Sequence, residues 1–251
     1  MTPRSVFITG ASSGLGRGLA LHYARAGATV HAVARRKPEL HALAAEAPKG
    51  SVAPVVLDVT DTERLVEAIH AAEATSGGAL DLVIANAGVG IPSSARKMDW
   101  KSVRTTFEVN TTAASVTIAA ALPAMVARGA GQVVAVSSLA AFRGMPGNAA
   151  YCASKAALHV FMESVRVDLR GTGVRATTIY PGFVKTEMTA KNKFPMPFLM
   201  ELEDAVRATA RGIERGKAIV AYPLPMAALV RTLAAVPRSV YEPVAARGRM
   251  F

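Results

Sequence analysis

Seven short runs of mostly apolar residues, rich in valine and isoleucine, are spaced along the chain and separated by stretches with a helical pattern. The runs do not alternate between apolar and polar residues, so strands formed by them would be buried on both faces. Buried strands that alternate with helices are typical of a parallel sheet with helices on both sides. We therefore predict an α/β fold, a doubly wound parallel sheet of about seven strands, formed by SVFIT, TVHAV, VAPVVL, LDLVIA, GQVVAVS, VRATTIY and KAIVAY.

The 251 residues suffice for one large domain, and no repeat or low-complexity linker interrupts the series, so we predict a single domain over residues 1–251. Residues 183–204 form an irregular stretch with several prolines, methionines and phenylalanines, and long loops of this kind often act as lids. Residues 223–251 form an apolar tail with basic residues at its edges.

Composition excludes several classes of protein. Hydrophobic residues make up 51% of the chain and charged residues 19%, which argues against disorder. One cysteine, Cys152, cannot form an internal disulfide, and the five histidines show no metal-ligand spacing, so we expect no metal. There is no signal-peptide pattern, and the uncharged run 109–127 carries Asn, Thr and Ser, so we expect a cytoplasmic protein. The net charge of +11 comes without a nucleic-acid reader motif and indicates a solvated basic surface rather than nucleic-acid binding.

The first apolar run leads into TGASSGLGRGLA, in which Gly10, Gly14 and Gly16 precede a helical pattern. A glycine turn lets backbone N–H groups approach a diphosphate, and the helix N-terminus behind it favours negative charge. The spacing G-x-x-x-G-x-G differs from the G-x-G-x-x-G of the general dinucleotide fingerprint. We predict a dinucleotide-binding turn; the alternative is a turn that only lets the helix pack tightly.

The second run ends in AVARRKPE, about 20 residues after the glycines. A dinucleotide fold places there either an acid for a ribose 2′-hydroxyl or an arginine for a 2′-phosphate. Here Ala34 stands where the acid would be, and Arg35 and Arg36 follow. Guanidinium groups bind phosphate well, so the stretch favours NADP(H) over NAD(H), although solvated arginines at a strand end are common.

Tyr151 and Lys155 are four residues apart in AAYCASKAALHVFMESVRVDLR, which predicts a long helix. The spacing places the phenol and the ammonium on one face, one turn apart. Lowering the pKa of a tyrosine by about 3 units takes roughly 4 kcal/mol, and a cation about 5 Å away supplies about 3 kcal/mol at an effective dielectric constant near 20. We therefore predict that Lys155, together with the positive charge of an oxidised nicotinamide, lowers the pKa of Tyr151 into the range of a general acid–base group. The apolar stripe predicted to pack is Ala153, Ala157, Val160, Phe161, Val165 and Leu169.

Ser138 lies thirteen residues before Tyr151, at the end of GQVVAVSS, where a hydroxyl can donate to an oxygen that gains negative charge. Each residue has an ordinary alternative: Ser138 as a loop cap, Asn110 as a polar helix residue and Lys155 as a solvated charge. Their occurrence together with the glycine turn favours an active site. Cys152 faces elsewhere on the helix and is interpreted as a packed residue.

These motifs, in this order and over nearly the whole chain, resemble those of the short-chain dehydrogenase/reductase family. Ala85 departs from the asparagine that many members have. The matching motifs are T-G-x-x-x-G-x-G at 9–16, N-A-G at 86–88, Asn110, Ser138, Y-x-x-x-K at 151–155, and P-G at 181–182 followed by Thr186.

The resemblance implies a Rossmann-like fold and an oxidoreductase that moves hydride between a nicotinamide and a carbon bearing oxygen. It implies that Tyr151 is the general acid–base, that Ser138 bonds the substrate oxygen, that Lys155 holds the nicotinamide ribose and that Asn110 holds a water. A non-catalytic NADP(H)-binding sensor or scaffold on the same fold is the alternative. The predicted cofactor-binding residues are Gly10, Ser12, Ser13, Gly14, Leu15, Gly16, Arg35, Arg36, Asp58, Val59, Asn86, Ala87, Gly88, Tyr151, Lys155, Pro181, Gly182, Val184 and Thr186.

The predicted substrate region is apolar, which suits a hydrophobic ketone or aldehyde, although the same residues could pack between subunits. A homodimer or homotetramer is expected, because the apolar segment 109–127 must be covered on more than one face and because members of the family resembled are commonly oligomeric. The tail, with Leu229, Leu233 and Val236 at helical spacing, could pack on the protein, cap a partner or, as a minority hypothesis, touch an anionic membrane. The predicted substrate-lining residues are Phe142, Met145, Phe183, Phe194 and Phe198.

Overall fold

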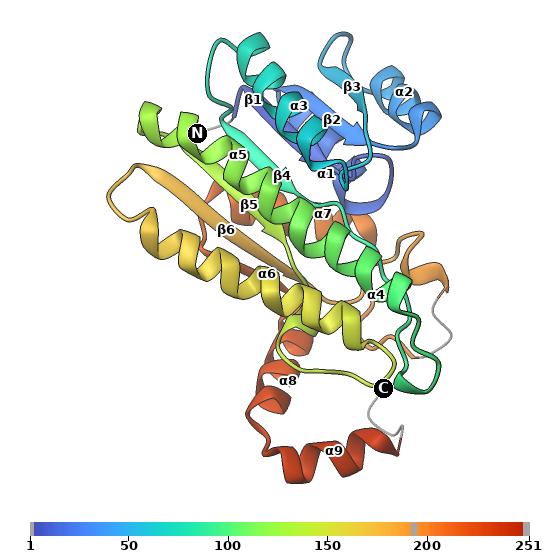
Figure 1. The fold of residues 1–251 in the computed structure, drawn as a ribbon. Coiled ribbons are helices and arrows are strands. Elements are labelled where there is room, and N and C mark those ends of the chain that lie inside the picture. The colour runs from blue at the N-terminus through green and yellow to red at the C-terminus, as the bar shows by residue number, and fades with distance from the viewer. Residues whose placement is uncertain (1–2, 192–194, 248–251) are drawn as a thin grey trace.

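The computed structural model describes residues 3–191 and 195–247 of the chain. Their strands form one parallel sheet, in the order β3-β2-β1-β4-β5-β6-β7. The predicted doubly wound fold is therefore confirmed, and all seven apolar runs are strands (Figure 1). The strands are β1 (Ser5–Thr9), β2 (Thr29–Ala34), β3 (Val52–Val56), β4 (Leu82–Ala85), β5 (Gly131–Val136), β6 (Val174–Pro181) and β7 (Ile219–Tyr222).

Helices cover both faces of the sheet (Figure 1). Three of them, α1 (Gly14–Arg25), α2 (Lys37–Glu46) and α7 (Leu202–Glu214), pack on one face. The helices α3 (Thr62–Thr75), α5 (Ala114–Arg128) and α6 (Ala149–Asp168) pack on the other. At the end of the chain, α8 (Leu224–Ala235) and α9 (Arg238–Ala246) extend past the sheet.

Each inner strand contributes to two cores, because successive side chains point to opposite faces. In β1, Val6 and Ile8 belong to the core beneath α1 and α7, whereas Phe7 belongs to the core beneath α3 and α5. The same division separates Ile84 from Val83 in β4. The strands are therefore apolar at nearly every position, which is the pattern seen in the sequence.

The winding of the sheet reverses between β1 and β4. From β1 the sheet grows outward through β2 to β3; the chain then crosses back, and β4 pairs with the other edge of β1. In open α/β sheets, ligands bind outside the carboxyl ends of the strands at this reversal. The carboxyl ends of β1 and β4 are Thr9 and Ala85, directly before the glycine turn and Asn86.

The segment that leads into α5 is a continuous helical run with a wider turn in its middle. It begins with α4 (Trp100–Phe107), continues through a π-helical turn, Glu108–Ala113, and becomes α5. By length and composition alone, residues 100–128 could cross a membrane, but 44% of the most apolar window is buried in this structure. Its apolar character is that of a helix packed between β4, β5 and α3.

The predicted long helix is α6, and its buried face matches only part of the apolar positions noted in the sequence. The buried residues of the helix include Ala150, Ser154, Leu158 and Met162, whereas Val160 is 57% exposed. Two stripes on this helix are rich in apolar residues, and the one with Ser154 and Lys155 faces inward because their polar atoms find partners there. Of the apolar positions noted in the sequence, Ala153, Ala157 and Val160 are exposed, whereas Phe161, Val165 and Leu169 pack against the core.

The tail is helical, as the spacing of Leu229, Leu233 and Val236 predicts, and Leu233 and Val236 are half-buried. In α8 the residues Met226, Ala227 and Val230 are buried, whereas Leu229 is 41% exposed. The tail forms two helices that contact the segment after β5: the Tyr241 hydroxyl donates to Gly144 O at 2.6 Å, and Arg143 donates to Ala234 O at 3.2 Å.

Candidate functional site

The glycine turn joins β1 to α1 and leaves the helix N-terminus open. Gly10 and Gly14 have φ of 71° and 52°, in the left-handed region that favours glycine. Ser13 is the N-cap residue, but its side chain makes no capping hydrogen bond. Free N–H groups at such a terminus are ready donors for an anion.

Asn86 and Thr9 hold the turn to β4. The Asn86 side chain donates to Thr9 O at 2.9 Å and to Gly10 O at 3.3 Å. In return, Thr9 Oγ1 accepts from the backbone N–H groups of Asn86 at 3.0 Å and Ala87 at 3.1 Å. These bonds fix the first part of the predicted cofactor site to the sheet.

We expect Gly16→Ala to destabilise the fold by about 1–3 kcal/mol, the usual range for overpacking, and to weaken dinucleotide binding. A Cβ at Gly16 would lie 2.3 Å from Asn86 Nδ2 and 2.4 Å from Gly10 O, so the hydrogen-bonded contact between Asn86 and the glycine turn would have to move. Urea unfolding and an NADPH titration measure the two effects. Gly144→Ala is the control, because a Cβ there meets no described atom within 4 Å. Equal free energies of unfolding for the two variants would contradict the claim that the space at Gly16 is needed for the contact between Asn86 and the glycine turn.

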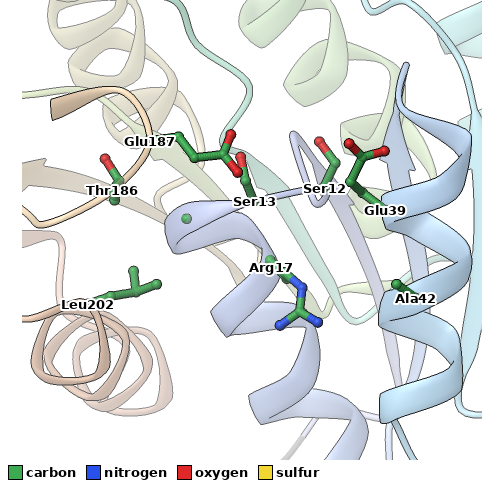
Figure 2. A pocket seen from close by; sticks show the side chains of 9 residues that line it. Ser12, Ser13, Arg17, Glu39, Ala42, Thr186, Glu187 and Leu202 are labelled. Atoms are coloured by element: carbon green, nitrogen blue, oxygen red, sulfur yellow. The ribbon is translucent and has the colours of Figure 1, made fainter. Parts of the chain in front are cut away.

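A cavity of about 360 Å³ lies in front of the turn. Figure 2 shows its lining: Ser12 and Ser13 of the turn, Arg17 of α1, Glu39 and Ala42 of α2, and Thr186, Glu187 and Leu202 from the segment after β6, with Gly14 completing the list. A Cβ on Gly14 would lie 3.3 Å from Thr186 Cγ2. The open helix N-terminus and the cavity beside it fit the diphosphate of a dinucleotide.

Arg35 and Arg36 follow β2 and have different partners. The Arg35 guanidinium lies 3.4 Å from the Asp58 carboxylate. Burial raises the pKa of Asp58, but hydrogen bonds from Thr60 and the Arg35 charge outweigh burial and hold the pKa below its usual value. Arg36 Nε donates to Ser12 Oγ at 3.1 Å, which ties the end of β2 to the glycine turn.

Asn110 lies in the π-helical turn and is fully buried. Its Oδ1 accepts from Val89 N at 2.8 Å, and its Nδ2 donates to Val89 O at 3.0 Å and to Ser154 Oγ at 3.1 Å. The side chain thereby fixes the loop after β4 against α6. Wide turns of this kind in helices are frequent at functional sites.

Lys155 projects from α6 to the end of β5. Its Nζ donates to Val136 O at 2.8 Å, and the side chain is only 4% exposed. Burial lowers the pKa of Lys155 to about 8. A Cβ on Gly88 would lie 3.5 Å from Lys155 Nζ and 3.3 Å from Asn110 Oδ1. The three predicted residues Gly88, Asn110 and Lys155 therefore meet.

Ser138 and Tyr151 complete this cluster. Ser138 Oγ donates to Pro181 O at 3.4 Å and accepts from Ala140 N at 3.1 Å. Burial raises the pKa of Tyr151, and a hydrogen bond with Ser138 offsets part of this rise. In the protein without a cofactor, burial of the phenol dominates, and Lys155 directs a donor to Val136 O. The predicted lowering of the pKa, which also depends on the charge of an oxidised nicotinamide, stays a prediction.

The segment after β6 lies beside the cluster. Gly182 N donates to Tyr222 O at 2.7 Å, and Val184 is buried. Val184 and Met200 form a parallel bridge with each other outside the strands of the sheet. Thr189 Oγ1 accepts from Thr186 N at 2.9 Å and closes the turn that carries Thr186. The remaining predicted cofactor residues Leu15 and Val59 pack against the two cores.

The predicted substrate-lining residues are only partly in open positions. Phe142 packs against the Tyr180 ring, with centroids 5.0 Å apart, and Phe183 joins the same apolar cluster with α8. Met145 is half-buried, and Phe198 is 51% exposed. Phe194 lies outside the described residues. Phe142 and Phe183 thus serve as packing residues at the base of the predicted substrate region.

Two residues beside the site were missed by the sequence analysis. Ser154 Oγ accepts from Asn110 Nδ2 and donates to Tyr151 O at 2.8 Å, so it links two predicted catalytic residues. Glu187 lies 3.0 Å from the Arg36 guanidinium. Ser154 could have been found from its position within Y-x-x-x-K, whereas Glu187 has no sequence signal, because its partner is 151 residues away.

Cys152 is buried, and burial raises the pKa of its thiol, as expected for a packed cysteine rather than a nucleophile. Within residues 3–191 and 195–247, no group of three or more His, Cys, Asp or Glu side chains is placed to hold a metal ion.

A glycine turn at the reversal point of a doubly wound sheet, facing a cluster of Ser, Tyr and Lys, defines a dinucleotide-binding protein of the α/β class. The pattern of the short chain dehydrogenase family matches residues 4–195. The chain therefore belongs to the short-chain dehydrogenase family of oxidoreductases, and the resemblance seen in the sequence is confirmed.

Known proteins of similar sequence or structure support this assignment. A Myxococcus xanthus protein described as an uncharacterized oxidoreductase is 53% identical over 99% of both chains. A short chain dehydrogenase from Burkholderia cenocepacia in complex with NADP is 28% identical, with a TM-score of 0.81 over 96% of both chains. A short chain dehydrogenase/reductase from Burkholderia phymatum in complex with NAD shares the fold, with 22% identity and a TM-score of 0.83 over 91% of this chain and 92% of that one.

Proposed function

We propose that the protein is an NADP(H)-dependent oxidoreductase that interconverts a carbonyl and an alcohol, with Tyr151 as general acid–base. The observation that carries the proposal is the hydrogen bond between Ser138 and Tyr151, with Lys155 one turn further along α6 and against Gly88. NADPH oxidation measured against a panel of ketones and aldehydes, with NADH alongside, tests it.

Residues of this chain would transfer the proton to and from the substrate oxygen. In carbonyl reduction, the Tyr151 hydroxyl donates its proton to the substrate oxygen, while the Ser138 hydroxyl donates a hydrogen bond to the same oxygen. A bound nicotinamide supplies the hydride. Lys155 uses one N–H on Val136 O and keeps two further donors for a ribose hydroxyl. Ser154 and Asn110 hold the Tyr151 turn of α6 and the loop at Val89 in place.

Cofactor preference is proposed from Arg35 and Arg36. Both follow β2 beside the glycine turn, and Arg36 contacts Ser12 directly. A 2′-phosphate bound there would meet two guanidinium groups, whereas an acid that would favour NAD(H) is replaced by Ala34.

We expect the double variant Ala34→Asp, Arg35→Ser to weaken NADPH binding by about tenfold to a hundredfold, the size of one charged hydrogen bond, and to strengthen NADH binding. Titration with both cofactors measures the change. Arg104→Ser is the charge control, because Arg104 on α4 pairs at 3.3 Å with Glu108 of the π-helical turn. A wild-type protein that binds NADH at least as tightly as NADPH would overturn the proposed preference.

A non-catalytic NADP(H) sensor or scaffold is the rival function. The presence of both Tyr151, whose backbone carbonyl accepts from Ser154, and Lys155, whose Nζ donates to Val136 O, favours the enzyme. Tight NADPH binding without turnover of any carbonyl or alcohol would favour the rival. For the enzyme we propose a hydrophobic substrate, because the surroundings include Phe142, Phe183 and Phe198.

We further propose a homodimer or homotetramer in the cytoplasm. The outer side of α5 and α6 exposes Val126, Val160 and Val167 at 42%, 57% and 61%, a set of apolar side chains suited to a second copy of the chain. The tail contacts Gly144 and Arg143, which supports a structural role beside the substrate region and leaves membrane contact the minority proposal. Sedimentation at micromolar concentration tests the oligomer; a monomer would contradict it.

A further inference from the structure

Arg36 is held between two parts of the chain that are far apart in sequence. Its Nε donates to Ser12 Oγ at 3.1 Å, and its NH1 donates to Glu187 Oε2 at 3.0 Å. Glu39 Oε1 lies 3.7 Å from the same NH1. The Arg36 side chain is 39% exposed. Its guanidinium is therefore shared between Ser12 of the glycine turn and the carboxylates of Glu187 and Glu39.

The pair between Arg36 and Glu187 lies across the glycine turn. Glu187 follows Thr186, whose Cγ2 would lie 3.3 Å from a Cβ on Gly14. Figure 2 shows the Glu187 carboxylate directed toward Ser12 and Ser13, above the N-terminus of α1. The carboxylate thus stands at the mouth of the cavity proposed for the cofactor phosphates.

The charges lining this cavity oppose a further negative group. Glu39 and Glu187 are among its lining residues, and the lining arginine, Arg17, pairs with Glu46 at 2.5 Å. A phosphate monoester carries a charge of about −1.5 to −2 at neutral pH. It can bind Arg36 only by displacing Glu187 from it or by sharing the guanidinium with that carboxylate.

We propose that Glu187 is a specificity-determining residue that competes with the 2′-phosphate of NADP(H) for Arg36. The inference rests on the proposed use of NADP(H), and it gives Glu187 the role of reducing that preference. A ribose 2′-hydroxyl, as in NAD(H), has no charge and does not draw Arg36 away from the carboxylate. Glu187 therefore lowers the affinity for NADP(H) more than the affinity for NAD(H).

Glu187→Gln tests the competition, because the amide keeps the shape of the side chain and removes its charge. The probes are adenosine 2′,5′-bisphosphate and adenosine 5′-monophosphate, titrated by calorimetry, so no turnover is needed. We expect the variant to bind the bisphosphate about fivefold more tightly, the size of an exposed ion pair, and to gain distinctly less affinity for the monophosphate. Glu201→Gln is the matched control, because Glu201 instead pairs with Lys185 Nζ at 3.2 Å.

The same substitution in an Arg36→Gln background should lose most of its effect, since the competition requires the guanidinium. An equal effect on both probes, no effect on either, or a full effect without Arg36 would overturn the inference. The wild-type titration separates this result from the proposed cofactor preference. If the wild type binds both probes equally while Glu187→Gln favours the bisphosphate, the preference is wrong and the role of Glu187 stands.

Discussion

Replacing Tyr151 with phenylalanine is expected to lower kcat with NADPH by about 10²- to 10⁴-fold, the range for loss of a positioned proton donor. The variant removes one oxygen and leaves the ring that packs in α6. Ser138 would still donate a hydrogen bond to a substrate oxygen, but the phenylalanine at position 151 has no hydroxyl proton to donate. Steady-state turnover of the best carbonyl from the substrate panel, together with an NADPH titration, measures the effect, and the affinity for NADPH should change little.

Tyr23→Phe is the matched control for this substitution. Tyr23 is buried in α1, and its hydroxyl has no hydrogen-bond partner among the residues that the structure describes. Removing that hydroxyl should leave turnover unchanged and the fold at least as stable. Full activity in Tyr151→Phe, with both variants folded by circular dichroism, would show that the proton comes from another group.

The strands could be predicted from the sequence because their signal is local. The inner strands are buried on both faces, so their composition separates them from half-exposed strands, whereas the edge strands β3 and β7 are partly exposed. The order of the strands follows from the winding of a parallel sheet, but the residues at the carboxyl ends, such as Thr9 and Asn86, become a site only when β1 and β4 are neighbours.

The faces of helices were harder to predict. On α6 both the outer stripe with Val160 and the inner stripe with Leu158 are apolar, and periodicity cannot choose between them. The choice depends on where Ser154 and Lys155 find partners, namely Asn110 and Val136 O, which lie on other elements. The burial of Met226 and Val230 in α8 was missed for a similar reason, since they pack on Tyr180 and Leu139.

The order of the motifs predicted which site residues lie close together, but it did not predict the pKa shifts of Tyr151 and Lys155 in the folded protein. The spacing of Tyr151 and Lys155 suggested a lowered phenol pKa, whereas burial raises the pKa of Tyr151 and lowers that of Lys155. Burial depends on the whole fold, so it could not be read from a four-residue spacing. A positive charge brought by an oxidised cofactor is then the natural means of lowering the pKa of the phenol during the reaction.

Lys155→Met is expected to abolish most activity and yet to stabilise the protein at pH 7. The folded-state pKa of Lys155 is about 8, below its ordinary value of 10.5. Below pH 8 the folded protein therefore holds a buried charge, at a cost of about 3 kcal/mol for a shift of this size. Methionine has no such cost, but it leaves Val136 O without its hydrogen bond from Nζ, a loss of roughly 1 kcal/mol. The net gain at pH 7 is about 2 kcal/mol by these values.

The pH dependence distinguishes this cause from better packing by methionine. Between pH 8 and 10.5 the unfolded chain keeps the lysine proton and the folded chain loses it, so this residue makes the wild type more stable as pH rises. The difference in unfolding free energy between variant and wild type should therefore fall from about +2 kcal/mol at pH 7 to about −1 kcal/mol at pH 10.5, where only the lost hydrogen bond remains. Because other groups titrate in both proteins, they cancel in the difference. Urea unfolding at the two pH values measures this difference in unfolding free energy. If the difference stays constant with pH, burial of the Lys155 charge has no cost.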